Sequence, residues 1–285
     1  MRADGLRLIT QYHHGALAGE LAESWGNERF EVPPEPFAAA LTLAAAHHDD
    51  GWHELDDLPA HNAEAGRPAH FVEVPLERTV PAYGRGVDSV YERDPLAGAL
   101  VGMHWTGLYS ARWGLQSAGG PVPHPLAREL VAEQEPRRQQ AMLESWGFDG
   151  LRSEFEAQAW HAYEILQALD IASLALSLVD PAVPTDVGAT PLPLTATLAP
   201  VEQPAGGRLL PSIPTVPLGE HLELLLTVPE PGVAAIDPWP FAGKGFEVEL
   251  PSRLIPSDRL DEEEAAAAYR EAVVEPLRWA LRPAR

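Results

Sequence analysis

Potential metal ligands are concentrated in one short stretch of the chain. Residues 47–53 read HHDDGWH and directly follow the alanine run at 44–46. Imidazole nitrogens and carboxylate oxygens bind divalent first-row metals in proteins, and the chain has no cysteine to supply a thiolate ligand or a nucleophile. The stretch therefore predicts a site at a helix end for one or two divalent ions (Mn, Fe, Mg, Ni or Zn), bound through nitrogen and oxygen.

Partners for this stretch are expected on helices elsewhere in the chain, because apolar residues recur there at helical spacing. Gly26 marks the end of a first helix, Pro36 the start of a second, and Asp94-Pro95 the start of a third. The expected helices cover residues 14–25, 37–49, 95 onward, 125–146 and 151–179.

Four of these helices each carry a polar residue on their apolar face, namely His14, His48, His104 and Asp170. Burying an imidazole or an ionised carboxylate costs several kcal/mol unless the group is paired or bound to a metal. We therefore expect the four side chains to share one polar site inside a helical bundle. Asp49 follows His48 directly and is expected to join it. A buried hydrogen-bonded network without metal is the alternative.

Neighbouring histidines and acids are expected outside this site. His47 and Asp50 are placed beside it or in solvent. His161 lies on the opposite side of its helix from Asp170, so we expect it at the protein surface.

The composition indicates a protein with a substantial core and a small-molecule partner. The chain has 285 residues, of which 45% are hydrophobic. Its formal net charge of −22 disfavours binding to nucleic acid or to an anionic membrane surface. The N-terminal residues do not resemble a signal peptide, and no apolar stretch is long enough to span a bilayer. We expect a cytoplasmic protein, and a homo-oligomer is compatible with the sequence.

The last third of the chain has a different composition. Prolines are frequent between residues 181 and 256, among short runs in which apolar and polar residues alternate. These runs predict a small antiparallel sheet, and the acidic stretch from Asp258 predicts a helix that ends the chain. The expected fold is mainly α, with a helical bundle at 1–182 and, packed on the same core, a strand-rich extension with a C-terminal helix at 183–285.

The candidate ligands occur in an order that resembles the HD-domain superfamily, helical metal-dependent phosphohydrolases named for an adjacent His-Asp pair. The order is His14, then His48-Asp49 before Gly51, then His104, then Asp170. A wider set of motifs is similar to a bacterial family of unknown function: LITQ at 8–11, HDDGW at 48–52, GRP at 66–68, MH at 103–104, DIASL at 170–174 and DPWPF at 237–241. The superfamily resemblance covers roughly the first two thirds of the chain and implies an HD-like helical metal-binding domain at 1–182.

This resemblance implies a ligand set. His14, His48, Asp49 and Asp170 match the positions that bind the first ion. In two-metal members further histidines bind a second ion, and His53 and His104 are similar to these; Asp49 would then bridge the two ions.

The resemblance also implies a reaction in which a metal-activated water attacks a phosphorus centre, so no protein nucleophile is needed. Asp49 would act as the bridging ligand, and His53 or Asp56 would transfer protons.

One feature departs from the superfamily pattern. Many members have a lysine soon after the glycine, whereas the only lysine of this chain is Lys244. Phosphate would then be bound by arginines, for which Arg67, Arg85 and Arg112 are the candidates. The expected function is hydrolysis of a small phosphate-containing or nucleotide-like molecule.

Two other functions fit the same residues. Some relatives with this ligand set carry two irons and activate oxygen, and a histidine-rich, lysine-free site is compatible with such a di-iron oxygenase. The third possibility is a noncatalytic metal-containing protein that binds or senses a ligand.

Overall fold

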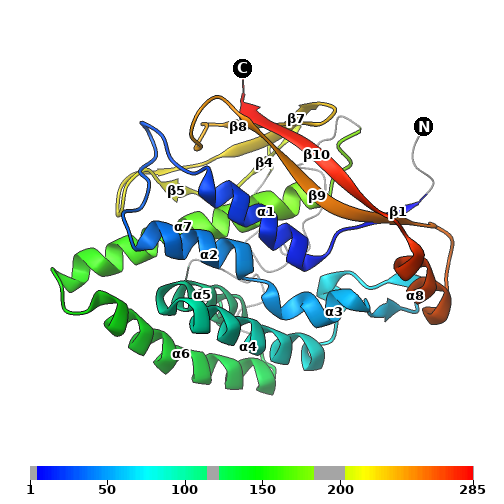
Figure 1. Ribbon diagram of the computed structural model, residues 1–285, viewed down its shortest axis with the longest axis horizontal. Coiled ribbons are helices and arrows are strands. Elements are labelled where there is room, and N and C mark those ends of the chain that lie inside the picture. The colour runs from blue at the N-terminus through cyan, green and yellow to red at the C-terminus, as the bar shows by residue number, and fades with distance from the viewer. Residues whose placement is uncertain (1–4, 114–121, 183–202, 285) are drawn as a thin grey trace.

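The computed structural model describes residues 5–113, 122–182 and 203–284. Most of its helices lie on one side of the sheet, and the helix near the C-terminus lies apart from them beside the first strand (Figure 1). The helices are α1 (Gln11–Glu23), α2 (Phe37–His47), α3 (His53–Asp57), α4 (Leu76–Arg93), α5 (Pro95–Ser110), α6 (Pro125–Trp146), α7 (Arg152–Ser177) and α8 (Glu262–Glu271), with short 3-10 turns η1 (Asp50–Trp52) and η2 (Phe71–Glu73).

Local sequence signals explain where the ligand-bearing helices begin. The Thr10 side chain accepts a hydrogen bond from the His13 backbone N–H (3.2 Å) and caps α1. Asp94 caps α5 in the same way through the Ala97 N–H (2.6 Å), with Pro95 in the first turn. The helices predicted at the positions of α1, α2, α5, α6 and α7 are confirmed.

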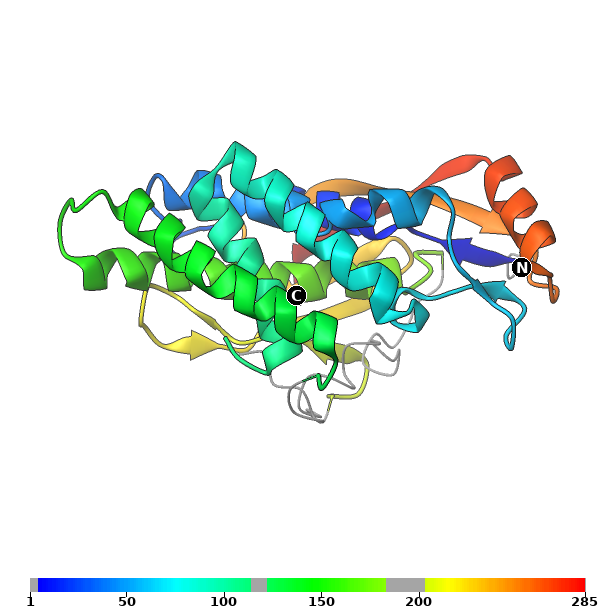
Figure 2. The same cartoon turned by 90° about the horizontal axis from the view of Figure 1, so that it is seen from below.

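One long helix was not expected. Turn residues such as Asn62, Gly66 and Pro68 follow Gly51 and indicate a long loop, and no helix was expected before Asp94. Helix α4 nevertheless occupies Leu76–Arg93 and contains Pro81 in its second turn. Helices α4, α5 and α6 contact one another and run side by side on one face of the molecule (Figure 2). Helix α4 packs against η1, which follows Asp49 in the HHDD stretch.

The sheet overturns the expectation of a mainly α HD-like bundle with a small antiparallel segment. It has six strands in the order β1-β9-β10-β8-β7-β4. The sheet is mixed, because β10 pairs in parallel with β8 and every other neighbouring pair in this order is antiparallel. The protein therefore has an α/β fold. The strands of this sheet are β1 (Leu6–Leu8), β4 (Gly207–Leu209), β7 (Leu225–Glu230), β8 (Val233–Asp237), β9 (Phe246–Ile255) and β10 (Val274–Pro283). The two-stranded ladders are β2 (His61–Asn62) with β3 (Arg67–Pro68), and β5 (Ile213–Pro214) with β6 (His221–Leu222).

The expected C-terminal helix is also corrected. Helix α8 forms, but β10 follows it and lies between β9 and β8 in the sheet. Leu277, Trp279 and Leu281 are buried at every second position, as a strand with one covered face requires. The alternation of Leu277, Trp279 and Leu281 is visible in the sequence, but the helix predicted from Asp258 extends over these residues.

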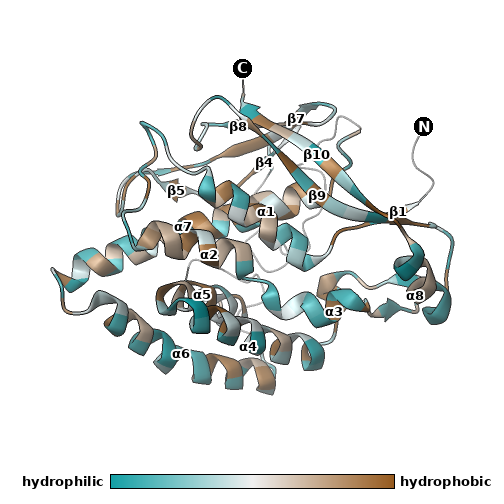
Figure 3. Ribbon diagram, in the orientation of Figure 1, coloured by the Kyte–Doolittle hydropathy of each residue, from teal (hydrophilic) through white to brown (hydrophobic). Residues whose placement is uncertain are grey.

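Helices and sheet share one hydrophobic core. It extends from Leu17 on α1 through Tyr163 on α7 to Trp279 on β10, and the apolar residues gather on α5, α7 and β8 (Figure 3). The division of the chain at residues 182 and 183 stays a prediction. Within the described residues, no helix has the length and apolar character needed to cross a membrane.

Candidate metal centre

Three side chains from three helices meet in the core. His14 comes from α1, His48 is the C-cap of α2, and Asp170 comes from α7. One ligand atom from each forms a set in which all atoms lie within 4.8 Å of one another. The three residues are at most 4% exposed. These are three of the four residues that helical periodicity predicted to meet, and the group could hold a metal ion.

A hydrogen-bond chain supports the tautomer of His14 that can bind a metal through Nε2. The Ser173 hydroxyl donates to the Asp170 carbonyl (2.8 Å), so its oxygen is left to accept from His14 Nδ1–H (2.8 Å). Nε2 of His14 then carries a lone pair. That lone pair faces Asp49 Oδ2 at 2.8 Å, and a proton or a cation is needed between the two acceptors.

The tautomer of His48 is fixed in the same sense. Its Nδ1–H donates to the Ala45 carbonyl (2.9 Å), which leaves the Nε2 lone pair without a hydrogen-bond partner among the described residues. Nε2 lies 3.4 Å from Asp170 Oδ1 and 3.8 Å from Asp49 Oδ2. The Nε2 atoms of two imidazoles and the oxygens of two carboxylates thus converge, and a divalent cation that prefers nitrogen and oxygen fits this donor set once His48 releases its proton.

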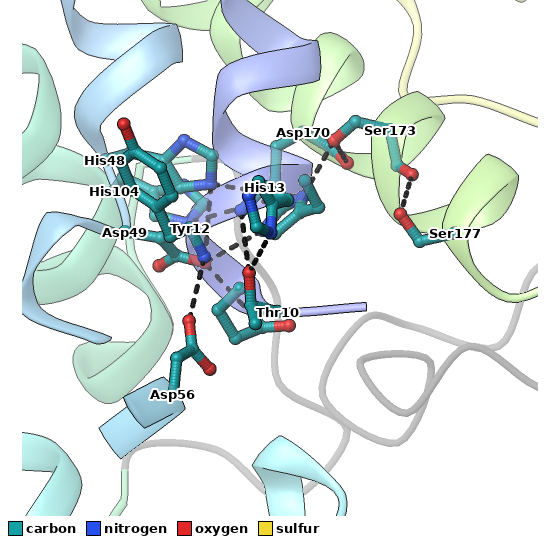
Figure 4. A network of polar contacts seen from close by, with 12 residues as sticks. Thr10, Tyr12, His13, His48, Asp49, Asp56, His104, Asp170, Ser173 and Ser177 are labelled. Carbon is teal, nitrogen blue, oxygen red and sulfur yellow. Dashed lines mark hydrogen bonds and ion pairs between the residues drawn. The ribbon is translucent and has the colours of Figure 1, made fainter. Parts of the chain in front are cut away.

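Asp49 and His104 border this group. Gln11 Nε2 donates to Asp49 Oδ2 (3.2 Å), while Asp49 Oδ1 is buried without a hydrogen-bond partner in the part of the chain that the structure describes. His104 Nε2 lies 3.7 Å from Asp170 Oδ2. Figure 4 shows Asp49, His48 and His104 on one side of the network and Asp170 with Ser173 on the other.

The pKa values of the group depend on two opposing effects, burial and the charges of neighbouring side chains. Burial alone would lower the pKa of His48, but Asp49 and Asp170 outweigh it and raise the pKa to about 9. Burial would raise the pKa of Asp170, but the neighbouring His48 lowers it to about 2. The pKa of His104 falls to about 4 because burial dominates there. Without a metal, the centre therefore favours ionised Asp170, protonated His48 and neutral His104, and an ion that binds His48 Nε2 would displace its proton.

A cavity of about 570 Å³ adjoins the centre and is lined by His14, Gln11 and Asp56. Asp56 Oδ2 accepts a hydrogen bond from the Tyr12 backbone N–H (3.1 Å). Burial, and to a smaller extent the charge of Asp49, raise the pKa of Asp56 to about 7. A carboxyl group that exchanges its proton near neutral pH therefore lies at the same cavity as a metal-ligand candidate.

The other candidate residues lie around the centre rather than in it. His53 is exposed, and its ring packs on Tyr12 at a centroid distance of 3.9 Å. Arg67 lines the cavity but is bound to both carboxylate oxygens of Glu73 (2.9 Å each).

Two predicted phosphate contacts are absent from the described lining of the cavity. Arg85 pairs with Glu54 (2.8 Å), and Arg112 pairs with Glu135 (3.4 Å). Their guanidinium charges are thus matched by carboxylates elsewhere on the protein.

Two expectations about neighbouring residues have different outcomes. His47 and Asp50 pair with each other (2.9 Å) outside the ligand group, which places them beside the site as predicted. The surface position expected for His161 is wrong, because this residue is 0% exposed and burial lowers its pKa. Helix α7 is covered on both faces, so the face opposite Asp170 is buried as well.

Sequence reasoning missed two kinds of contributor. Ser173 and Gln11 orient ligands through hydrogen bonds, and only the spacing of Ser173 three residues after Asp170 hinted at this. Arg7 and Arg78 line the cavity from β1 and α4, and no local signal linked them to the centre.

Comparison with known proteins gives one match. A family model described as "Protein of unknown function (DUF3891)" matches residues 1–257, which include all the motifs from LITQ to DPWPF. None of the curated proteins and none of the solved structures compared with the chain matches it.

Proposed function

The chain belongs to this family of proteins of unknown function, and from its own residues we propose that it hydrolyses a small phosphate-containing or nucleotide-like molecule with a water activated by a divalent metal. The observation that carries the proposal is the position of His14, which belongs both to the ligand group and to the lining of the cavity. Structural metal sites are closed by protein ligands, whereas catalytic sites keep a position open to substrate.

His14, His48 and Asp170 would hold the first ion, with Asp49 and His104 beside them for completion of its shell or for a second ion. A divalent cation there would polarise a phosphoryl oxygen and lower the pKa of a bound water. Ser173 and the Ala45 carbonyl keep both imidazoles oriented with Nε2 inward. These second contacts preorganise the ligands before an ion binds.

Asp56 supplies the proton transfer in this proposal. Its carboxyl lines the cavity and has a pKa raised to about 7 by burial, which suits a group that accepts and returns a proton near neutral pH. The backbone N–H groups of Tyr12 and Gln11 hold this carboxylate in place at the cavity. His53 is exposed beside Tyr12 and is the second candidate for this role.

One observation favours a second candidate function. Two histidines and one carboxylate are the ligand set of non-haem iron oxygenases, and His14, His48 and Asp170 are such a set. An iron-dependent oxygenase, in its di-iron form with Asp49 and His104 included, is therefore the alternative.

The metal identity separates these functions. Protein purified without added metal is analysed for its elements and then assayed with bis(4-nitrophenyl) phosphate, 4-nitrophenyl phosphate and a panel of nucleotides. Stoichiometric metal with turnover supports the hydrolase, whereas iron with oxygen consumption and no phosphate release supports the oxygenase. Bound metal without turnover of either kind, together with a ligand-dependent melting shift, would instead indicate a binding or sensing protein.

A further inference from the structure

The cavity beside the metal centre is lined by several arginines although the protein is strongly acidic. The chain has 20 Lys and Arg against 42 Asp and Glu, yet Arg7, Arg67 and Arg78 all line this cavity. The acidic residues of the described lining are Asp56 and Asp180. Arginines placed together against the net charge raise the local concentration of an anion.

The three arginines differ in how their charge is matched. Arg67 is neutralised by its two bonds to Glu73. Arg7 Nη1 instead donates to the hydroxyl of Ser252 (2.9 Å), a neutral group that is 2% exposed and itself donates to the Glu275 carbonyl (2.8 Å). Ser252 thus orients the Arg7 guanidinium without cancelling its charge.

Arg78 is the least constrained of the set. It lies in the first turn of α4 and, within the described parts of the chain, its guanidinium forms no hydrogen bond or ion pair. Arg7 from β1 and Arg78 from α4 therefore line one cavity and form no ion pair with a carboxylate of the described residues. A guanidinium matches the geometry of a carboxylate or a phosphate through paired N–H donors.

The remaining lining is apolar and partly aromatic. Phe71 and Tyr269 belong to the lining, and Leu174 and Leu178 extend the apolar wall from the end of α7. A volume of about 570 Å³ suits a small organic molecule rather than a simple anion. Rings in the wall favour a flat body in the ligand.

We propose that this cavity binds an elongated small molecule whose carboxylate or phosphate group is held by Arg7 and Arg78 and whose flat apolar body lies along Phe71 and Tyr269. The inference rests on the proposed function in one respect, since it takes the cavity beside His14 to be the substrate site. It adds the substrate class, and it proposes Arg7 and Arg78, instead of Arg85 and Arg112, as the residues that bind the anionic group.

The test compares three probes that share one ring system: 1-naphthoate, 1-naphthylphosphonate and neutral 1-naphthol. Their dissociation constants are measured by titration calorimetry with the full-length protein as purified. Arg7→Gln and Arg78→Gln are expected to weaken the anionic probes by about tenfold each, as loss of a charged hydrogen bond implies, and to leave 1-naphthol unchanged. Whichever anionic probe binds more tightly identifies the preferred group.

Arg85→Gln is the matched control, because Arg85 is exposed and its partner is Glu54 outside the cavity. It should bind all three probes like the wild type. Arg7→Lys is the rescue variant and should recover part of the affinity for the anionic probes, which a folding defect would not allow.

The outcomes separate this inference from the proposed function. If 1-naphthol binds as tightly as the anionic probes, or if neither Arg7→Gln nor Arg78→Gln weakens the anionic probes, the inference is rejected. Metal content and phosphoesterase activity of the same preparations report on the function independently. Anion-selective, arginine-dependent binding without metal would keep the inference and reject the metal hydrolase.

Discussion

His14 Nε2 lies 2.8 Å from Asp49 Oδ2, although the bond from His14 Nδ1 to Ser173 leaves Nε2 as a lone-pair atom. Two acceptors at this distance repel each other unless a positive charge lies between them. His48 repeats the arrangement, because its Nδ1 is bound to the Ala45 carbonyl and its Nε2 lies 3.4 Å from Asp170 Oδ1. The centre thus places a positive charge, either the proton of His48 or a metal ion, among these acceptors, and the effects of substitutions follow from this.

Asp49→Ala should abolish stoichiometric metal binding. The substitution removes the carboxylate that faces both imidazoles, so the protein should also lose the rise in melting temperature that bound metal gives the wild type. Elemental analysis and thermal melting with and without added metal measure both effects. Asp57→Ala is the control, because Asp57 is exposed a few residues away on α3. Full metal content in Asp49→Ala would show that the ligand assignment is wrong.

Ser173→Ala should weaken metal binding by about 10–100-fold while leaving the ligands themselves in place. Ser173 accepts from His14 Nδ1–H, and without it the imidazole loses the contact that keeps Nε2 directed inward. Competition with a fluorescent chelator measures the affinity. Ser177→Ala is the matched control, because Ser177 donates only to the Ser173 carbonyl within α7. Equal affinities for the two variants would contradict the positioning role.

Asp56→Asn should change the dependence of stability on pH. Burial raises the folded pKa of Asp56 from 3.8 to about 7, so the folded protein keeps a proton that the unfolded chain has lost over this window. Stability contributed by this group is therefore full below pH 4, falls as pH rises to about 7 and stays constant above that value. The asparagine variant should lack this fall, measured as urea midpoints between pH 4 and 8.

Asp57→Asn provides the comparison for this experiment, since the neighbouring carboxyl is exposed. A constant difference between the wild type and Asp56→Asn across the whole pH range would mean that Asp56 titrates normally. If Asp56 also transfers protons in catalysis, the pH limb of kcat near 7 should disappear in the same variant.

The ligand group was predictable from sequence because helical faces are local information. The apolar positions around His14, His48 and Asp170 repeat within a few residues, so each segment reveals by itself which side is buried. The same reasoning failed for His161, because α7 is buried on both sides and a helix that is covered all round has no solvent face to identify.

The sheet was not predictable in this way because its pairing is non-local. Leu6 on β1 pairs with Ile255 on β9, and Ala280 on β10 pairs in parallel with Val233 on β8. Short strands separated by proline-rich segments show alternation but not their partners. Arg7 reaches the cavity only because β1 joins this sheet, so the substrate contacts proposed here depend on the part of the fold that local patterns do not encode.

Gly86→Ala should destabilise the protein by about 1–3 kcal/mol and weaken metal binding, because α4 packs directly on the segment that follows Asp49. A Cβ at Gly86 would lie 2.6 Å from the Gly51 backbone N, where only a backbone shift could relieve the contact. Such a shift moves η1, which begins directly after Asp49.

Gly84→Ala is the matched control on the same helix. The nearest atom to a Cβ there is Leu130 Cδ1 at 3.8 Å, an ordinary contact, so the gain in helix propensity should stabilise the protein by up to about 1 kcal/mol. Urea unfolding and metal titration of both variants measure these effects. If the two alanines changed stability and metal affinity alike, the close approach of α4 to Gly51 could not be what positions Asp49.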